Sequence, residues 1–262
     1  MFRPKVILHT VLFILIGSFL YSAQSDAQSK EVINPPQKKF EISFGGGWGL
    51  YNMRDINKHY IDELAELGGI SCGHINNGPN IFGEVGYFVS PNVSASLGIT
   101  YLNGASGKGE NMFIAYGYEN QPADTFLEEG SLTTTLVAPE LKVKYHFPFE
   151  KTDLFLSGGV AWCFGKCVLK STLKAQGESV SGKSLFTAQG IGSLASTGAW
   201  YNLNKTISLG AEVGFRYFVT GDLKDKDKDG ERKVGTTGSF TGYKTNLDFS
   251  GPFILGGLRL KL

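Results

Sequence analysis

The chain has 262 residues and is almost neutral, with 25 lysines and arginines against 24 aspartates and glutamates. This balance gives no support for nucleic-acid binding, which needs a strongly basic face. Glycine is abundant, at 35 residues, but it is interleaved with Phe, Tyr, Val and Leu. That alternation favours the curved strands of a small barrel over a disordered chain.

The first 27 residues have the pattern of a secretory signal peptide. Arg3 and Lys5 precede an apolar stretch over 6–21, and small residues around Ala27 suit a cleavage site. A membrane anchor helix is the alternative, but the stretch is short for the roughly 20 residues that span a bilayer. We expect cleavage after Ala27, followed by a flexible periplasmic lead-in over 28–39, which is polar and contains two prolines.

Eight segments after residue 39 alternate apolar and polar residues with a period of two, which indicates β-strands. In the third, apolar residues from Val93 to Tyr101 alternate with serine, glycine and threonine. Their length suits tilted strands that cross a bilayer. The sixth has no clear apolar face, and Pro139 in the fourth predicts a bulge. The predicted strands are 40–50, 81–89, 93–101, 133–147, 153–169, 185–201, 207–217 and 248–262.

The connections between these strands alternate between short and long. The short ones cover 90–92, 148–152 and 202–205, and the long ones cover 51–79, 104–131, 170–184 and 220–246. This rhythm is typical of an all-β, eight-stranded antiparallel up-and-down transmembrane β-barrel with tight periplasmic turns and long extracellular loops. A soluble barrel would need its apolar faces inside, whereas here charged residues occupy the minor face of the strands.

The first long loop contains a predicted short helix at 56–67. Its apolar stripe consists of Ile56, Tyr60, Ile61, Leu64 and Leu67. Two glycines follow it and provide a stop. We expect this helix to cap the extracellular mouth of the barrel, and docking on a partner or on lipid headgroups is the alternative.

These features together resemble the small outer-membrane β-barrel family typified by the OmpA transmembrane domain and OmpX. The resemblance covers 40–262 and includes the signal peptide, the eight strands, the loop rhythm and a chain that stops on its last strand. It implies localisation in the bacterial outer membrane, contact with outer-membrane lipid and insertion by the outer-membrane assembly machinery. The chain departs from the family in ending on Leu262 instead of an aromatic residue. We expect a monomer.

Charged residues collect on the faces that are predicted to line the barrel. They are the acids Glu84, Glu140 and Glu212 and the bases Lys142, Arg216 and Arg259. Lys144 and His146 of the fourth strand face the same way. An eight-stranded barrel is only wide enough for side chains to fill it, so we expect a compensated network that plugs the lumen. A proton relay or an acid–base pair is the alternative.

The last long loop carries alternating acids ahead of Gly230, which resembles the start of a calcium loop. The acids in 222–230 are Asp222, Asp225, Asp227 and Asp229. Thr236 stands where the closing glutamate would lie, and three lysines interleave with the acids. We therefore expect a solvated loop tip instead of a calcium site, and we assign no metal or cofactor.

The three cysteines are expected to be isolated packing residues. Cys163 and Cys167 lie on one predicted strand, with side chains about 13 Å apart, which is too far for a disulfide. Pairing of Cys72 with Cys167 near the loop rim is an alternative, and the odd count leaves one thiol free.

No residue is assigned a catalytic role. After the predicted signal peptide the histidines are His59, His74 and His146, and Ser71 near His74 has no acid fixed beside it to orient the pair. We predict a non-catalytic protein with a structural or surface-binding role, in which the long loops meet an extracellular ligand. A narrow pore or a transporter of small hydrophobic molecules is the first alternative, and a lipid-modifying outer-membrane enzyme is the second.

Overall fold

The computed structural model describes residues 39–62, 65–66, 69–115, 124–175, 178–227, 230–233 and 245–262. The predicted signal peptide and the lead-in up to residue 38 lie outside this part of the chain. The strands are β1 (Phe40–Leu50), β2 (Asn77–Ser90), β3 (Val93–Ala105), β4 (Gly109–Ala115), β5 (Asp124–Pro148), β6 (Thr152–Ala175), β7 (Glu178–Asn202), β8 (Ile207–Thr220), β9 (Lys224–Asp227), β10 (Gly230–Lys233) and β11 (Gly251–Lys261).

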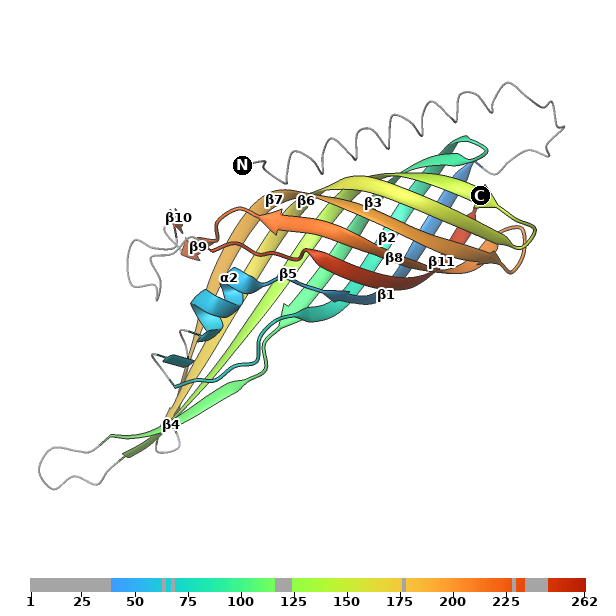
Figure 1. The fold of residues 1–262 in the computed structure, drawn as a ribbon. Coiled ribbons are helices and arrows are strands. Elements are labelled where there is room, and N and C mark those ends of the chain that lie inside the picture. The colour runs from blue at the N-terminus through green and yellow to red at the C-terminus, as the bar shows by residue number, and fades with distance from the viewer. Residues whose placement is uncertain are drawn as a thin grey trace, which may run out of the picture. The chain divides into compact units, whose positions relative to one another are not determined.

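Eight of these strands form a closed antiparallel ring, which confirms the predicted up-and-down barrel (Figure 1). Going round the ring, the order is β1, β2, β3, β5, β6, β7, β8 and β11. The ring closes where β1 pairs with β11, from Glu41 opposite Lys261 to Gly49 opposite Phe253. Both ends of the barrel domain therefore lie at the end with the short turns, which is the periplasmic end in barrels of this type.

The predicted helix in the first long loop is confirmed, although it begins earlier than expected. Helix α2 (Arg54–Ile56) continues into a π-helical turn, η1 (Asn57–Asp62). Ile56, Tyr60 and Ile61 of the predicted stripe are buried, whereas Leu64 and Leu67 lie outside the described residues. Within the described part of the chain, no helix has the length and hydropathy to cross a membrane.

Two of the predicted long loops are instead continuations of the sheet. β6 and β7 stay paired as far as Ala175 opposite Glu178, so most of 170–184 is a regular hairpin. Likewise β4 pairs with β5 from Gly109 opposite Gly130 onward, within the predicted loop at 104–131. The apolar alternation ends there because a strand beyond the bilayer no longer needs an apolar outer face, and backbone pairing continues without it.

Two other expectations about the strands are wrong in detail. The ladder between β5 and β6 skips Pro139 but resumes in the same register, so the proline loses a hydrogen bond without forming a bulge. The sixth predicted strand, β7, does have two faces. Its lumen side holds Phe186, Leu194 and Trp200 among glycines and serines, and polar residues on its outer side hide the alternation.

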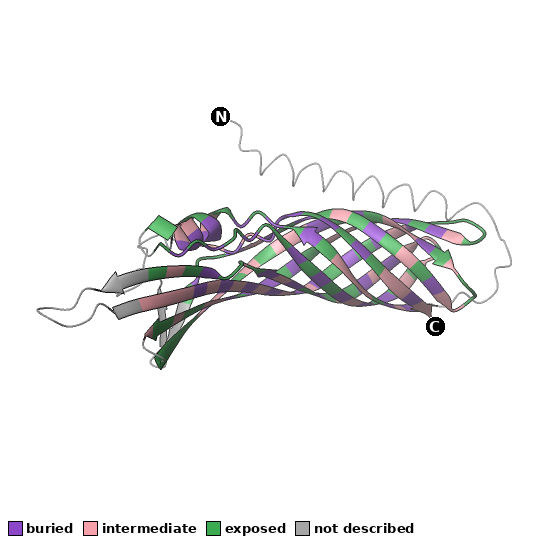
Figure 2. Ribbon diagram, turned by 90° about the horizontal axis from the view of Figure 1, so that it is seen from below, coloured by how far each residue is buried: buried purple, intermediate pink, exposed green. Residues whose placement is uncertain are grey.

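Apolar side chains cover the outside of the ring, while polar and charged side chains alternate with them on the inside. Figure 2 shows this as exposed and buried residues alternating along each barrel strand. Two belts of aromatic residues lie along the outer face. The periplasmic belt comprises Phe40, Tyr87, Tyr145, Phe147 and Tyr201, and the extracellular belt comprises Trp48, Tyr101, Trp162, Phe164 and Tyr217.

The belts are separated by the distance that a membrane requires. Phe40 and Trp48 stand eight residues apart on β1, which is about 26 Å along a strand and somewhat less across the membrane because barrel strands are tilted. An apolar band of this height with aromatic girdles at both interfaces is the outer surface of a barrel that spans the outer membrane.

Candidate functional site

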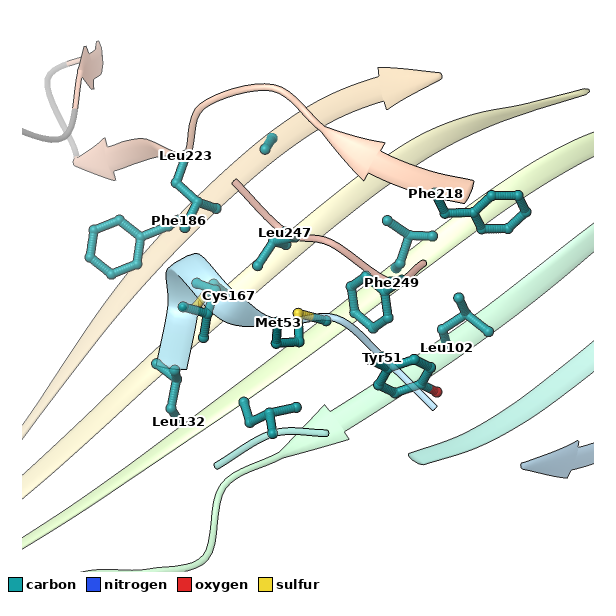
Figure 3. Close-up of a cluster of buried hydrophobic side chains, with 14 of the residues drawn as sticks. Tyr51, Met53, Leu102, Leu132, Cys167, Phe186, Phe218, Leu223, Leu247 and Phe249 are labelled. Carbon is teal, nitrogen blue, oxygen red and sulfur yellow. The ribbon is translucent and has the colours of Figure 1, made fainter. Parts of the chain in front are cut away.

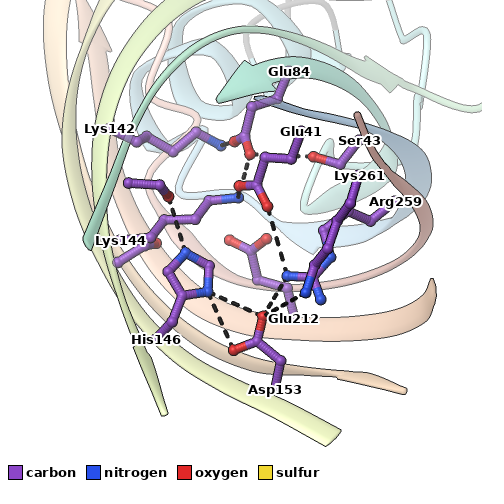
Figure 4. Close-up of polar contacts among 12 residues, drawn as sticks. Glu41, Ser43, Glu84, Lys142, Lys144, His146, Asp153, Glu212, Arg259 and Lys261 are labelled. Carbon is purple, nitrogen blue, oxygen red and sulfur yellow. Dashed lines mark hydrogen bonds and ion pairs between the residues drawn. The ribbon is translucent and has the colours of Figure 1, made fainter. Parts of the chain in front are cut away.

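An ionic network fills the periplasmic half of the lumen, and in one part of it Glu84 of β2 faces two lysines of β5 (Figure 4). Lys144 Nζ donates to Glu84 Oε1, and Lys142 Nζ lies 3.0 Å from Glu84 Oε2. Lys142 Nζ also lies 2.9 Å from Glu140 Oε2, and the Ser43 hydroxyl donates to Glu84 at 3.1 Å. The two lysines and Glu140 project from alternate positions of β5, where the strand period of two places them on one face.

A second part of the network lies closer to the periplasmic rim and links three strands. Arg259 Nη1 of β11 donates to Asp153 Oδ2 of β6 at 2.5 Å and lies 3.6 Å from Glu41 Oε2 of β1. Glu41 Oε1 is 3.8 Å from Lys144 Nζ, so this carboxylate joins the two parts through ion pairs that are longer than hydrogen bonds. The network therefore ties the first and last strands of the ring to its middle.

The predicted lumen charges are confirmed as buried, and the network is larger than expected. Glu84, Glu140, Glu212, Lys142, Arg216 and Arg259 are all buried inside the ring. Glu41, Lys144, His146 and Asp153 join them. The sequence pattern does not mark Asp153, because it is the second residue of β6 at the rim, where the alternation has only begun.

Arg216 forms no ion pair with Glu212 or another acid among the described residues, although we expect it from the sequence to compensate one. Its Nε donates to the Phe249 carbonyl and its Nη2 to Asn80 Oδ1, both at 3.3 Å. Its guanidinium also lies over the rings of Tyr51 and Phe253, at 5.6 and 5.0 Å. Glu212 instead accepts a hydrogen bond from the Ser196 hydroxyl at 2.6 Å. Arg216 thus forms the boundary between the ionic network and the apolar layer above it.

We expect Arg216→Ala to lower the free energy of unfolding by about 1–3 kcal/mol, because the Phe249 carbonyl loses the arginine donor in a buried site and Asn80 Oδ1 keeps only the Tyr51 hydroxyl. Chemical unfolding of the protein in vesicles measures this change. Adding Glu212→Gln should give an additive loss, since distant groups act independently. A double variant that is more stable than Arg216→Ala would contradict the observed separation of the two residues.

One chain of hydrogen bonds has the residue types of a catalytic triad. His146 Nε2 lies 2.9 Å from the Ser94 hydroxyl, and His146 Nδ1 lies 3.1 Å from Asp153 Oδ2. The three residues come from β3, β5 and β6, so their meeting could not be deduced from sequence spacing. However, Ser94 is 0% exposed and Asp153 is also bound by Arg259. A substrate has no access to this hydroxyl. The three hydrogen-bonded residues belong to the ionic network.

An apolar plug closes the extracellular half of the lumen (Figure 3). Met53, Ile56 and Ile61 of the first loop pack inside the ring, together with Leu247 and Phe249 of the segment before β11. These residues meet lumen-facing side chains of the barrel wall, which are Leu102, Leu132, Leu136, Cys163, Cys167, Phe186 and Phe218. The described residues of the first loop, including its helix, therefore cap the mouth of the barrel, as expected.

Tyr51 connects the plug to the polar layer beneath it. Its hydroxyl donates to Asn80 Oδ1 at 3.0 Å, and its ring packs edge-on against Phe249 at 4.9 Å between centroids. Burial raises the pKa of Tyr51 to about 12, against the opposing influence of the Arg216 charge. The phenol therefore stays neutral, as a plug residue in an apolar mouth requires.

The three cysteines are free and buried. Cys163 and Cys167 line the wall around the plug, and Cys72 lies in the first loop with its thiol 3.5 Å from the Gly130 carbonyl. Burial raises the pKa of the Cys72 thiol. A raised pKa and low exposure are typical of a cysteine that packs in the interior, whereas a reactive thiol has a lowered pKa and is accessible.

Other predicted candidates do not assemble into a site. The backbone of β9 pairs with β10 as a hairpin where the calcium loop was considered, while Asp229 and Thr236 lie outside the described residues. No cluster of metal-ligating side chains occurs in the part of the chain that is described. His74 Nε2 lies 2.8 Å from Asp62 Oδ1, so an acid does accompany it, but no hydrogen bond to Ser71 is present among the described residues.

A projecting sheet continues the barrel wall beyond its extracellular mouth (Figure 1). It consists of β4 and the outer parts of β5, β6 and β7. Leu173 and Val180 stand directly opposite each other on its lumen-facing side, and Val180 is 73% exposed. On its outer side Lys174 donates to Glu129, and this hydrogen bond lowers the pKa of Glu129.

Comparison with known proteins finds solved structures that are similar to this chain at low sequence identity. No protein-family model and no curated protein match the sequence. Among solved structures, Neisserial surface protein A is 12% identical with a TM-score of 0.44, covering 85% of this chain and 97% of that one. OprG of Pseudomonas aeruginosa is 12% identical with a TM-score of 0.43, and the match covers 86% of this chain and 97% of OprG. The protease OmpT of Escherichia coli is 10% identical with a TM-score of 0.39, and the match covers 89% of this chain and 100% of OmpT.

Proposed function

We propose that this eight-stranded outer-membrane β-barrel is closed to solutes and acts as a non-catalytic scaffold for its extracellular sheet. The observation that carries the proposal is that side chains fill the lumen at two levels. The ionic network around Glu84 occupies the periplasmic half, and the plug around Ile56 occupies the extracellular half. A narrow pore or a transporter of small hydrophobic molecules would need a continuous path through both levels.

The projecting sheet is the surface that we propose to meet an extracellular ligand. Binding residues are commonly carried on segments that a rigid scaffold holds away from its core. Here the scaffold is the barrel, and the paired strands β6 and β7 hold Leu173 and Val180 exposed beyond its mouth. This exposed apolar pair offers an ordered surface that a partner can cover.

A lipid-modifying enzyme is the other alternative, and among the described residues the Ser94–His146–Asp153 hydrogen bonds are the observation that favours it most. The burial of Ser94 argues against it, because acyl transfer needs a nucleophile within reach of a substrate carbonyl. The arginine bound to Asp153 also competes with the histidine for that carboxylate. These contacts support a structural role for the three residues.

The surface role can be tested by shortening the projecting hairpin without disturbing the barrel. Ser171 and Gly182 stand directly opposite each other, four residues below the present tip pair. Replacing residues 172–181 with Asn-Gly should therefore close a tight turn with the strand alternation preserved. Leu173→Ser/Val180→Ser keeps the full sheet and removes only its apolar pair.

We expect both variants to fold with the heat-modifiable gel mobility of the wild type. Cells that carry the full-length chain should retain a macromolecule from their growth environment that cells with the shortened hairpin do not retain. If the serine variant also loses this retention, the apolar pair is responsible. If the serine variant keeps it, the backbone of the sheet is responsible. Equal retention by the wild-type and shortened proteins would contradict a surface role for this hairpin.

A further inference from the structure

Three exposed lysines gather on the outer face of β6 and β7, just beyond the extracellular aromatic belt. They are Lys166 and Lys170 of β6 and Lys183 of β7, and we call them the basic patch. None of the three has an ion-pair partner among the residues that the structure describes. The next lysine outward, Lys174, differs because Glu129 pairs with it.

The register of the hairpin places two of these charges side by side. Lys170 and Lys183 are directly opposite each other in the β6–β7 ladder. Side chains in that relation have Cβ atoms about 5 Å apart, and like charges there destabilise the sheet. The arrangement becomes favourable when an anion sits between the two ammonium groups.

Hydroxyl groups surround the basic patch on the same face. Ser131 of β5 stands opposite Lys170, and Lys166 lies between Thr135 of β5 and Thr187 of β7. Lysine ammonium groups flanked by serine and threonine hydroxyls supply the donors that phosphate oxygens require. The chemistry of the patch therefore fits a phosphate group better than a carboxylate, which offers fewer acceptor oxygens.

The basic patch begins with Lys166 at the height of the headgroup layer of the extracellular leaflet, and Lys170 and Lys183 lie above that layer. Trp162 and Phe164 on the same face of β6 are exposed and belong to the extracellular belt. Lys166 follows Phe164 by two residues and Lys170 by six, which is about 7 and 20 Å along the strand. Strand tilt shortens both heights, and a lysine side chain can reach back toward the membrane by several ångströms.

The opposite side of the barrel has no such feature. The mouth ends of β1, β2 and β3, over 44–50, 77–85 and 97–105, contain no lysine or arginine. Among the barrel strands, exposed positive charge just beyond the belt is therefore concentrated on β6 and β7, as expected for a local binding site and not for a general interfacial collar. A site continuous with the lipid-facing belt is placed to take a lipid as its ligand.

We propose that the basic patch binds the phosphate groups of a phosphorylated lipid headgroup in the extracellular leaflet. The acyl chains of that lipid lie against Trp162 and Phe164, and its phosphates lie between Lys166, Lys170 and Lys183. The inference rests on the membrane-spanning barrel but not on recognition by the projecting sheet. Loss of lipid binding and loss of surface retention are separate measurements on separate variants.

The test compares lipid binding to the folded full-length protein by native mass spectrometry from nanodiscs. The probes are a diphosphorylated glucosamine lipid and the same lipid without its phosphates. The variants are Lys166→Gln/Lys170→Gln/Lys183→Gln and a control with the same charge change at the periplasmic rim, Lys39→Gln/Lys151→Gln/Lys205→Gln. All six lysines are exposed, so both variants should keep the heat-modifiable mobility of the wild type.

We expect the patch variant to bind the phosphorylated lipid on the order of 100-fold more weakly, from about fivefold for each lysine. The control variant should bind like the wild type. Equal binding by all three proteins, or equal binding of the lipid without phosphates, would overturn the proposal. Displacement of the lipid by inorganic phosphate in solution would also overturn it, because the ligand would then be a soluble anion.

A second variant separates ligand binding from a purely structural role of the basic patch. Lys183→Glu places an opposite charge across from Lys170 and should raise the melting temperature in a zwitterionic detergent. The same variant should lose affinity for the phosphorylated lipid. A lower melting temperature, or unchanged lipid affinity, would contradict the idea that the like-charged pair is kept for an anion.

Discussion

Glu84→Ala is expected to be the most destabilising single substitution in the lumen. It removes the carboxylate that accepts from both Lys142 and Lys144. Lys142 keeps its ion pair with Glu140, whereas Lys144 keeps only the 3.8 Å contact with Glu41 and becomes the poorly compensated charge. Removing one partner of a buried ion pair typically costs about 3–5 kcal/mol, because the remaining charge is neither solvated nor paired. The change is measured as the free energy of unfolding in urea with the protein folded into vesicles.

The cause of the loss can be isolated with two companion variants. Glu84→Ala/Lys144→Met removes the poorly compensated charge with a side chain of similar length, so it should recover part of the stability lost in Glu84→Ala. Glu129→Ala breaks an exposed pair on the projecting sheet and should leave stability unchanged. If the free energy of unfolding of Glu84→Ala equalled that of the wild type, it would contradict the idea that Glu84 compensates the buried lysines.

Charging the plug is expected to release the first loop while the barrel stays folded. Ile56 is 0% and Ile61 is 2% exposed, both inside the apolar cluster at the mouth. Ile56→Asp/Ile61→Asp would bury two unpaired carboxylates there, and the loop can avoid that cost by leaving the lumen. Exposed Arg54 and Lys58 then become open to trypsin. We expect cleavage at these sites to accelerate by about 100-fold or more.

Ser71→Asp is the control for this variant, because it adds a carboxylate at an exposed position of the same loop. Trypsin should cleave it at the wild-type rate. The cleaved Ile56→Asp/Ile61→Asp protein should still show heat-modifiable mobility, since the ring of strands does not include the loop. Cleavage of that variant no faster than the control would mean that the plug residues do not hold the loop in the lumen.

The barrel and the inward charges could be predicted because a strand's pleat fixes which face each residue occupies. Once β5 is a strand, Glu140, Lys142 and Lys144 must share a side, and apolar neighbours put that side inside. The ring also follows from alternating strands joined by short turns. Beyond the bilayer this signal disappears, which is why 170–184 was expected to be a loop although its backbone stays paired.

Partners within the lumen could not be predicted, because they depend on the stagger between strands. Glu212 and Arg216 share a face of β8 but stand four residues apart, about 13 Å along the strand. The stagger brings Arg216 level with Asn80 of β2 instead. It also brings Ser94 to His146, a contact between strands that no motif marks. The face that a residue occupies follows from its own strand, whereas its height in the barrel depends on the stagger of all the strands in the ring.

Single-channel recording in planar bilayers tests most directly whether the barrel is closed. The purified protein, reconstituted at single-molecule density, should give no steady current at any applied voltage, because the ionic network and the plug occupy successive levels of the lumen. Ile56→Asp/Ile61→Asp should also remain silent, since the network below the plug is intact. A stable, ion-selective current through the wild-type protein would contradict a closed scaffold and favour the pore.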